Sequence, residues 1–475
     1  MALLGMGLLS TSCDDELNAL PTQQIVEEDL ITDAASAEVA LNGVYYCFVQ
    51  AGTDYFDSKS TSYAFFYEIM PAMFSGLANY GYGTMGLELH SNDGYGDYLW
   101  SYFYTTVTAA NSVIAQMEEA DDSWFSGDRK TEIIAEAKLL RAYSYYELLR
   151  WFGYHWDIDS EYGIILRSEP TSVYNQSMDR SSVSETYDFI LDDIDYAITY
   201  GPSASSRGNY YVNEWVARGL KARVLMLRGE GTDYADAASL AAEIINSGEY
   251  TLESNMTDIF DKGLDSSEVM FGTYPYSGQA GEFNRYFSYG STPYYPLSEA
   301  LIALYADDDP RLTALMKSNY MLDYNTYTYS YRQLNCKHYD LSSGSYSDDS
   351  EVCYPMRLTE FYLLRAEALV YTGGDTDEIK SLVKTIETCA GLTDFSAIEE
   401  ASTDEELLRE IYVELLRNMF NESGRELDPL MRMPTSVVED ICPYTETPAT
   451  MVLPIPDDEF DFNSALSSQN PGYSS

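Results

Sequence analysis

The residues best suited to chemistry in this chain are aromatic, because 44 of its 475 residues are tyrosine. Tyrosine combines an apolar ring face with a hydroxyl group, so a surplus of tyrosine is typical of wet binding surfaces. Many of these tyrosines crowd residues 58–96 and 263–354, which are also rich in small and polar residues. Binding is therefore expected there, although the same rings could equally fill core positions.

Known catalytic and metal-binding motifs are absent from the sequence. No GxSxG, HExxH, GxxxxGK[ST] or GxGxxG pattern occurs, and His90, His155 and His338 show no helical pairing. Paired carboxylates could serve a glycosidase, but 77 acidic residues make chance pairs unavoidable. The oxygen donors of residues 91–97 fail the EF-hand pattern. We predict a binding protein with no catalytic residue, no metal site and no cofactor.

The charge of the chain excludes several kinds of partner. The sequence has 27 Lys and Arg against 77 Asp and Glu, which gives a net charge of −50. Such a field repels phosphate backbones and anionic lipid headgroups, so we expect neither nucleic-acid binding nor attachment through a basic patch. The acidic residues are interspersed with 14% aromatic residues, which argues against disorder.

The N-terminus has features of an export signal. Residues 2–9 form an apolar run that is too short to span a bilayer, and small residues follow it, although the basic start of a signal peptide is missing. Cys13 follows Leu-Ser-Thr-Ser, which resembles a bacterial lipobox with its aliphatic residue one place further upstream than usual. The acidic residues after Cys13 resemble an export tag of surface lipoproteins. We predict a signal-peptide remnant at 1–12 and a lipidated tether at 13–30.

The remaining cysteines do not form a recognisable site. Cys47, Cys336, Cys353, Cys389 and Cys442 contain no CxxC pair, which argues against zinc. Cys336 and Cys353 could close a short disulfide loop in an oxidising compartment. The sequence alone leaves that pairing open.

Apolar periodicity predicts a mainly α-helical scaffold that holds the tyrosine-rich segments. The strongest pattern covers 132–152 and pairs with 98–120 as a helical hairpin. Two further hairpins are predicted, one at 212–228 with 234–246 and one at 357–371 with 377–390. Three single helices are predicted at 34–48, 182–199 and 404–420. Repeated helix pairs resemble tetratricopeptide-like units, which bury their faces by stacking. The segments 58–96 and 263–354 lack this periodicity and predict loops with short strands.

Four motifs lie in order along the chain, at 40–45, 136–153, 357–368 and 453–473, and together they resemble the SusD/RagB family of Bacteroidetes outer-membrane nutrient-binding lipoproteins. Residues 136–153, EAKLLRAYSYYELLRWFG, resemble the signature helix of the family, and 40–45 resemble its first helix. Residues 357–368 resemble its R-x-x-E-x-x-L-x-x-A-E-A helix, and 453–473 its C-terminal pattern. Residues 414–429 lack the usual Arg and the Leu after the Asp, which predicts local repacking of the same fold.

The resemblance implies a domain organisation and a function. It implies a SusD-like N-terminal helical region at 31–260 and a SusD/RagB C-terminal region at 261–475, with the tyrosine-rich insertion inside the second. It also implies a lipid-anchored protein, exposed at the cell surface, that captures oligosaccharides and delivers them to a SusC-like TonB-dependent transporter. A peptide-binding RagB-like member and a helical-repeat adaptor with only a protein partner remain alternatives.

The family motifs themselves indicate structure and not ligand contacts. Glu136, Arg141, Glu360, Arg425 and Asp428 lie on apolar helical faces, where charges persist only when paired. We therefore predict that they form ion pairs of the scaffold.

Aromatic residues are the candidate ligand contacts, because neutral sugars present flat C–H faces that stack on rings. The acidic surface favours neutral oligosaccharides over acidic ones. Trp100 lies on a predicted helix, where it could equally be buried. The candidate ligand-binding residues are Trp100, Tyr98, Tyr274, Tyr276, Tyr294, Tyr295, Tyr320 and Tyr327.

Overall fold

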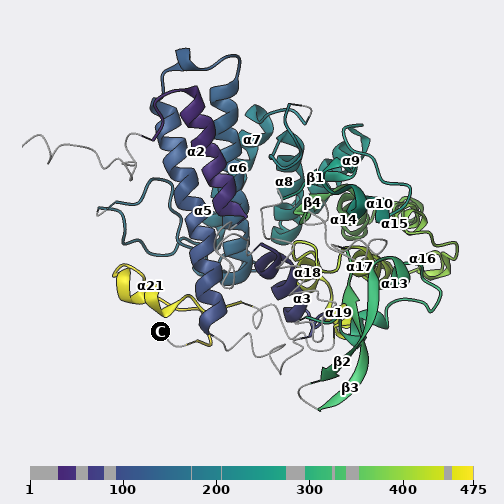
Figure 1. Ribbon diagram of the computed structural model, residues 1–475. Coiled ribbons are helices and arrows are strands. Elements are labelled where there is room, and N and C mark those ends of the chain that lie inside the picture. The colour runs from purple at the N-terminus through teal and green to yellow at the C-terminus, as the bar shows by residue number, and fades with distance from the viewer. Residues whose placement is uncertain are drawn as a thin grey trace, which may run out of the picture.

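Helices form most of the chain in the computed structural model, and strands are few and short (Figure 1). The structure describes residues 30–49, 63–79, 93–172, 174–204, 206–273, 295–323, 327–337, 352–442 and 452–473. The prediction of a mainly α-helical fold built from helical hairpins is confirmed.

Six long helices in the described N-terminal part pack side by side in chain order (Figure 1). They are α2 (Ala34–Phe48), α5 (Asp93–Glu119), α6 (Arg129–Phe152), α7 (Val183–Tyr200), α8 (Glu214–Arg228) and α9 (Asp233–Asn246). Side-chain caps set the starts of α2, α7 and α8: Asp33 and Ser182 each form a capping box, and Asn213 accepts from two backbone N–H groups. All six helices were predicted within a few residues of their ends.

The C-terminal part continues the same core. Its main helices are α14 (Leu358–Tyr371), α15 (Thr376–Cys389) and α17 (Asp404–Met419), and shorter ones are α16 (Ser396–Glu400), α18 (Leu427–Arg432), α19 (Thr435–Ile441) and α21 (Asp457–Phe462). Helix α14 packs against both α9 and α17. Its approach to α8 requires Gly219, because a Cβ there would lie 2.5 Å from Met356 Sδ and 2.6 Å from Phe361 Cζ.

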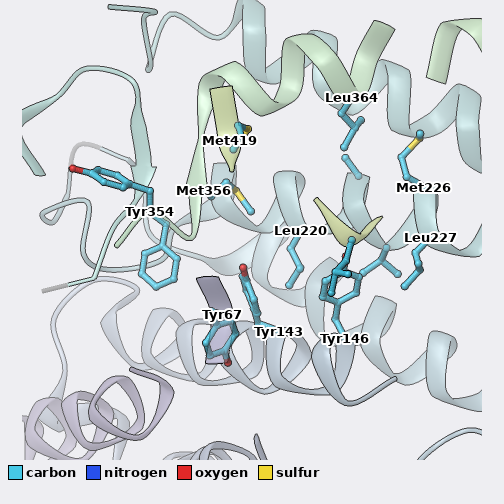
Figure 2. Packing of buried hydrophobic residues seen from close by; sticks show 14 of the residues in the cluster. Tyr67, Tyr143, Tyr146, Leu220, Met226, Leu227, Tyr354, Met356, Leu364 and Met419 are labelled. Carbon is cyan, nitrogen blue, oxygen red and sulfur yellow. The ribbon is translucent and has the colours of Figure 1, made fainter. Parts of the chain in front are cut away.

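Much of the tyrosine belongs to this core. Figure 2 shows Tyr143 and Tyr146 of α6 in the same buried cluster as Leu220 of α8 and Leu364 of α14. The largest fully buried side chains include Tyr63, Tyr67, Tyr143, Tyr145, Tyr146, Tyr187 and Tyr354. The alternative that tyrosine fills core positions therefore holds for these residues.

The prediction of loops and strands for 58–96 is wrong for residues 63–74 and 93–96, which are helical. A π-helical turn, η2 (Ala64–Ile69), leads directly into α3 (Met70–Phe74). Pro71 has no N–H to donate, and the backbone N–H of Met70 bonds to the carbonyl of Phe65 five residues earlier, which is the π pattern. Nearly every residue of this segment is buried, so it shows no alternation of polar and apolar faces.

The insertion at 263–354 contains the expected short strands. Strands β2 (Met316–Asp323) and β3 (Thr328–Asn335) form an antiparallel hairpin, and β1 (Val269–Phe271) pairs with β4 (Met356–Arg357). Short helices also occur in or beside this region: α10 (Thr257–Lys262), the 3-10 turn η5 (Gly263–Asp265), α12 (Glu299–Ile302) and α13 (Arg311–Ala314). Another 3-10 turn, η4 (Asp122–Trp124), lies between α5 and α6. Figure 1 shows the β2–β3 hairpin extending away from the helices.

The predicted ion pairs of the scaffold are confirmed. Arg141 donates to both carboxylate oxygens of Asp193, at 2.7 and 2.8 Å. Glu136 is fully buried and accepts from Arg129 and Arg207. Glu360 pairs with Arg223, and Arg425 pairs with Asp428 at 2.6 Å. The Arg223–Glu360 pair joins α8 to α14, so it links the N-terminal part of the chain to the C-terminal part.

The five cysteines among the described residues form no cross-link with one another. All five in the described part of the chain are thiols, so the disulfide considered between Cys336 and Cys353 does not form. Burial raises the pKa of the Cys353 thiol well above its usual value, and the thiol therefore stays protonated.

Candidate functional site

One group of rings connects two of the predicted ligand contacts and is called here the aromatic cluster: Tyr98, Tyr102, Phe65, Phe66 and Tyr295. Tyr98 stacks on Tyr102 one turn later in α5, with ring centroids 6.1 Å apart. Both rings lie against Phe66, at 6.5 and 4.9 Å. Phe66 contacts Phe65 at 5.0 Å, which reaches Tyr295 at 6.0 Å. Tyr98, with 46% of its surface exposed, is the open end of this cluster.

The position of the cluster follows from backbone contacts around the π-helical turn. Just after α3, Ala78 forms an antiparallel bridge with Leu297, and the N–H of Asn79 donates to the carbonyl of Pro296 at 2.8 Å. The N–H of Leu297 donates in turn to the carbonyl of Gln333 on β3, at 2.9 Å. The chain from Tyr295 onward thus joins the aromatic cluster to the base of the β2–β3 hairpin.

A second group of rings lies on that hairpin and is called here the tyrosine face: Tyr320, Tyr329 and Tyr331. Tyr320 is paired with Tyr331 across the hairpin. The ring of Tyr320 stacks on Tyr329, at 5.5 Å and 22°, and contacts Tyr331 at 5.0 Å. All three rings are more than half exposed. Because side chains two residues apart share one face of a strand, the register itself brings these rings together.

The tyrosine face combines exposed rings with neutral hydrogen-bonding groups. The register also places Ser318 opposite Gln333 on this face, which adds a hydroxyl and an amide beside the rings. Lys317 and Arg332 alternate with these residues and so belong to the other face. An uncharged ring surface edged by hydrogen-bonding groups suits a ligand with flat C–H faces and neutral hydroxyls. Tyr327, 78% exposed, stands at the turn with a left-handed φ of 53°.

Trp100 lies apart from these two groups of rings. It follows Tyr98 by two residues, about 200° around the helix axis, so its indole points to another side of α5. The indole is buried, packs against Tyr104 and Phe152, and donates its N–H to Glu459 at 3.1 Å. The structure therefore does not bring Tyr98 and Trp100 together.

The other predicted contacts are of two kinds. Tyr295 is buried at 8% exposure, and so contributes the inner end of the aromatic cluster. Tyr274, Tyr276 and Tyr294 lie outside the described residues. Tyr329 and Tyr331 were missing from the set of candidates. The alternation Tyr-x-Tyr-x-Tyr at 327–331, which has the period of a strand, was the signal that could have found them.

The described residues show no arrangement that would hold a metal ion, because no group of three or more His, Cys, Asp or Glu side chains converges among them. His90 and His338 lie outside the described part of the chain. His155 is buried, and burial lowers its pKa to about 3, which keeps the ring neutral at physiological pH.

Stacked helical hairpins that carry two clusters of aromatic rings define a helical scaffold suited to binding. The chain matches two family models, one described as starch-binding and associating with the outer membrane, over residues 29–226, and the SusD family model over residues 310–441. The chain belongs to the SusD/RagB family.

Individual relatives are similar over different lengths. A SusD-like protein of Bacteroides ovatus is 30% identical over 169 residues, which cover 34% of this chain and 29% of that protein. SusD-like protein P2 of Formosa agariphila is 24% identical over 98% of both chains.

Solved structures share the fold over nearly the whole chain. A SusD superfamily protein from Bacteroides thetaiotaomicron superposes with a TM-score of 0.72 at 20% identity, covering 93% of this chain and all of that one. Surface glycan-binding protein A from Bacteroides fluxus gives 0.70 at 19% identity, with the same coverage.

Proposed function

We propose that this protein is a surface lipoprotein that binds oligosaccharides and delivers them to a SusC-like TonB-dependent transporter in the outer membrane. The observation that carries the proposal is the tyrosine face, where three exposed rings lie together on a hairpin that extends from the scaffold. Membership of a family described as starch-binding and associated with the outer membrane supports the same function.

Neutral oligosaccharides are the proposed ligand class. Tyr320, Tyr329 and Tyr331 offer ring faces with no charge among them, and the chain as a whole carries −50. Sugars rich in carboxylate or sulfate groups would be repelled by that field. The aromatic cluster, through the exposed ring of Tyr98, would extend the binding surface from the hairpin toward α5. Binding then needs no catalytic group, and we propose none.

Attachment to the membrane is proposed to occur through a lipid on Cys13. Leu30, where the described chain begins, follows Cys13 by 17 residues, which span at most about 60 Å when extended. No helix in the described ranges is long and apolar enough to cross a membrane. A lipidated cysteine would then tether the helical body within reach of a transporter in the same membrane.

A calorimetric panel tests the ligand class. The purified mature chain is titrated with neutral oligosaccharides, with uronate-containing oligosaccharides and with unstructured peptides of similar length. We expect binding heat with at least one neutral oligosaccharide and none with the uronates. Heat with peptides alone would replace the proposal by the peptide-binding alternative.

The partner and the anchor need separate measurements. Affinity purification of the tagged chain from detergent-solubilised outer membranes is expected to yield a TonB-dependent transporter in equal amount. Replacement Cys13→Ala is expected to release the chain from the membrane fraction. Recovery of no transporter would favour the adaptor alternative, and membrane retention of the Cys13→Ala variant would contradict the lipid anchor.

A further inference from the structure

Two buried cations lie beside the β2–β3 hairpin, one at each end of its chain. Arg311 lies five residues before β2 and Lys337 two residues after β3, and neither side chain is exposed to solvent. The ends of the hairpin meet at its base, where the N–H of Cys336 donates to the carbonyl of Leu315 at 2.8 Å. Since buried charges persist only when they are paired, the partners of these two cations show what the base of the hairpin is attached to.

Both cations contact the C-terminal half of helix α17. The guanidinium of Arg311 donates to the carboxylate of Glu414 at 2.7 Å. The ammonium of Lys337 donates to the backbone carbonyls of Asn418 and Phe420, at 2.8 and 2.7 Å. The last carbonyls of a helix have no partner within the helix and carry a partial negative charge, so a cation is favourable there.

Asn418 connects the two contacts into one network. Its side-chain amide donates at 2.6 Å to Oε1 of Glu414, the same atom that accepts from Arg311. Its backbone carbonyl accepts from Lys337. Glu414 and Asn418 are four residues apart, so they lie on one side of α17 in neighbouring turns. The two ends of the hairpin are therefore held on the same side of this helix.

The network continues from Lys337 into the C-terminal core. Lys337 also donates to Glu422, whose other oxygen accepts from Arg357 of β4 at 2.6 Å. Arg357 donates in turn to Glu268, the residue before β1, at 2.7 Å. Burial lowers the pKa of Lys337 to about 8, but the charge of Glu422 opposes this shift, so the ammonium keeps its proton at neutral pH. Charge thus joins the base of the hairpin both to α17 and to the β1–β4 pair.

The tyrosine face lies further out on the hairpin than these buried contacts. Tyr320 and Tyr331 are paired near the middle of the strands, and the strands extend away from the helices (Figure 1). An isolated two-stranded hairpin is marginally stable at best in water, so the direction of this one depends on how its base is held. A ligand that contacts the tyrosine face and the aromatic cluster together needs that direction to be constant.

We propose that Arg311 and Lys337 are positioning residues for sugar binding. They fix the base of the hairpin on α17 and so hold the tyrosine face at a constant position relative to the aromatic cluster, which lets one neutral oligosaccharide contact both groups of rings. Neither cation touches the sugar, because both are buried. The identity of the ligand rests on the proposed function.

Two replacements loosen the attachment from its two ends. Lys337→Met keeps a long unbranched side chain and removes the charge. Glu414→Gln keeps the shape of the side chain and removes the charge that faces Arg311, which stays paired with Asp309 at 2.8 Å. Arg432→Met is the matched control, because Arg432 also forms a buried pair, with Glu367, but this pair joins α18 to α14. Thermal unfolding measures how much stability each variant loses.

Trypsin cleavage under native conditions tests the attachment without any sugar. Lys317 of β2 and Arg332 of β3 are cleavage sites in the hairpin, and Lys384 of α15 is the internal reference. Cleavage within a strand requires local opening. We expect Lys337→Met to raise cleavage at both hairpin sites at least tenfold relative to Lys384, Glu414→Gln to act in the same direction, and Arg432→Met to stay within twofold of the unmodified chain. If Lys337→Met does not fold, Glu414→Gln decides. Unchanged relative cleavage in the folded variants would overturn the inference.

Calorimetry with a short and a longer neutral oligosaccharide of one series tests the role in binding. We expect the unmodified chain to bind the longer one more tightly, because it reaches from the tyrosine face to the aromatic cluster. Lys337→Met, or Glu414→Gln in its place, is expected to lower affinity for the longer one at least fivefold and to leave the short one within twofold, and Arg432→Met to change neither. Unchanged affinity for the longer one, an equal loss for both lengths, or no gain with length in the unmodified chain would overturn the inference.

The two measurements separate this inference from the proposed function. If the unmodified chain bound no neutral oligosaccharide, the proposed function would be contradicted. Trypsin cleavage would then decide by itself whether the two buried cations hold the hairpin.

Discussion

Replacement of one buried carboxylate, Asp428, tests whether ion pairs hold the two parts of the scaffold together. Its Oδ1 accepts from Arg150 of α6 at 2.7 Å, and its Oδ2 accepts from Arg425 at 2.6 Å and from the hydroxyl of Tyr146 at 3.0 Å. Burial alone would raise the pKa of Asp428, but the charges of Arg425 and Arg150 outweigh burial and hold the pKa below its usual range. Asp428 is therefore ionised in the folded protein.

The replacement Asp428→Asn keeps the shape of the side chain and removes its charge. Two charge-assisted hydrogen bonds are weakened, each contributing about 1.5–3 kcal/mol, and two buried guanidinium groups lose their carboxylate. We therefore expect a loss of about 3–5 kcal/mol in the free energy of unfolding. Asp195→Asn is the matched control, because Asp195 is 54% exposed in its pair with Lys221, and exposed pairs contribute about 1 kcal/mol or less.

Urea unfolding followed by tryptophan fluorescence measures both variants at neutral pH. The midpoint of Asp428→Asn is expected to fall well below that of the unmodified chain, and the midpoint of Asp195→Asn to stay close to it. If the two variants lost the same small amount of stability, the role assigned to the buried pairs would be refuted. A normal urea midpoint with altered sugar binding in Asp428→Asn would also contradict this role, because Asp428 would then be a ligand contact.

Two further predictions concern the core. Neither carboxylate oxygen of Glu426 finds a hydrogen-bond donor in the described structure, and burial raises its pKa to about 8. As the pH rises from 4.5 toward 8, the carboxyl of Glu426 ionises in the unfolded chain but stays protonated in the folded one, so the folded state loses stability over this range. Between pH 5 and 8 the free energy of unfolding of Glu426→Gln should therefore rise by roughly 3–4 kcal/mol relative to that of the unmodified chain, at about 1.4 kcal/mol per pH unit. If the urea midpoints of the two proteins differed by the same amount at pH 5 and at pH 8, this prediction would be contradicted. Gly219→Ala should lower the free energy of unfolding by about 1–3 kcal/mol through contact with Met356 and Phe361. Gly43→Ala, in open space on α2, should instead raise the free energy of unfolding by up to about 1 kcal/mol. If thermal unfolding showed Gly219→Ala to be more stable than Gly43→Ala, close approach at Gly219 would not limit packing.

The long helices were predictable from apolar residues at steps of three and four, and α2, α7, α8 and α17 also carry capping side chains at their starts. Residues 34–48 were predicted as a helix, and α2 has those bounds, with Asp33 as its cap. The segment from Ala64 to Phe74 was missed because burial on all sides removes the alternation that reveals a helix. Helix α21 was missed for the opposite reason, since none of its residues is buried.

The candidate site was predictable in its composition but not in its arrangement. The excess of tyrosine pointed to residues 263–354, and Tyr320 does lie on the tyrosine face. Its neighbours Tyr329 and Tyr331 depend on the register of β2 and β3, which the turn and the pairing determine. The separation of Tyr98 from Trp100 depends on rotation about the axis of α5. Neither the grouping of the tyrosine face nor the separation of Tyr98 from Trp100 can be predicted by counting residue types.

The central claim is that the rings of the tyrosine face bind sugar, and calorimetry of one variant tests it most directly. Tyr320→Ala combined with Tyr331→Ala is titrated with a neutral oligosaccharide that binds the unmodified chain, and Tyr200→Ala serves as the control. Two stacking rings contribute about 1–3 kcal/mol, so affinity is expected to fall about 5- to 150-fold without a change in thermal unfolding. Affinity that stays within twofold of the unmodified chain would contradict the claim.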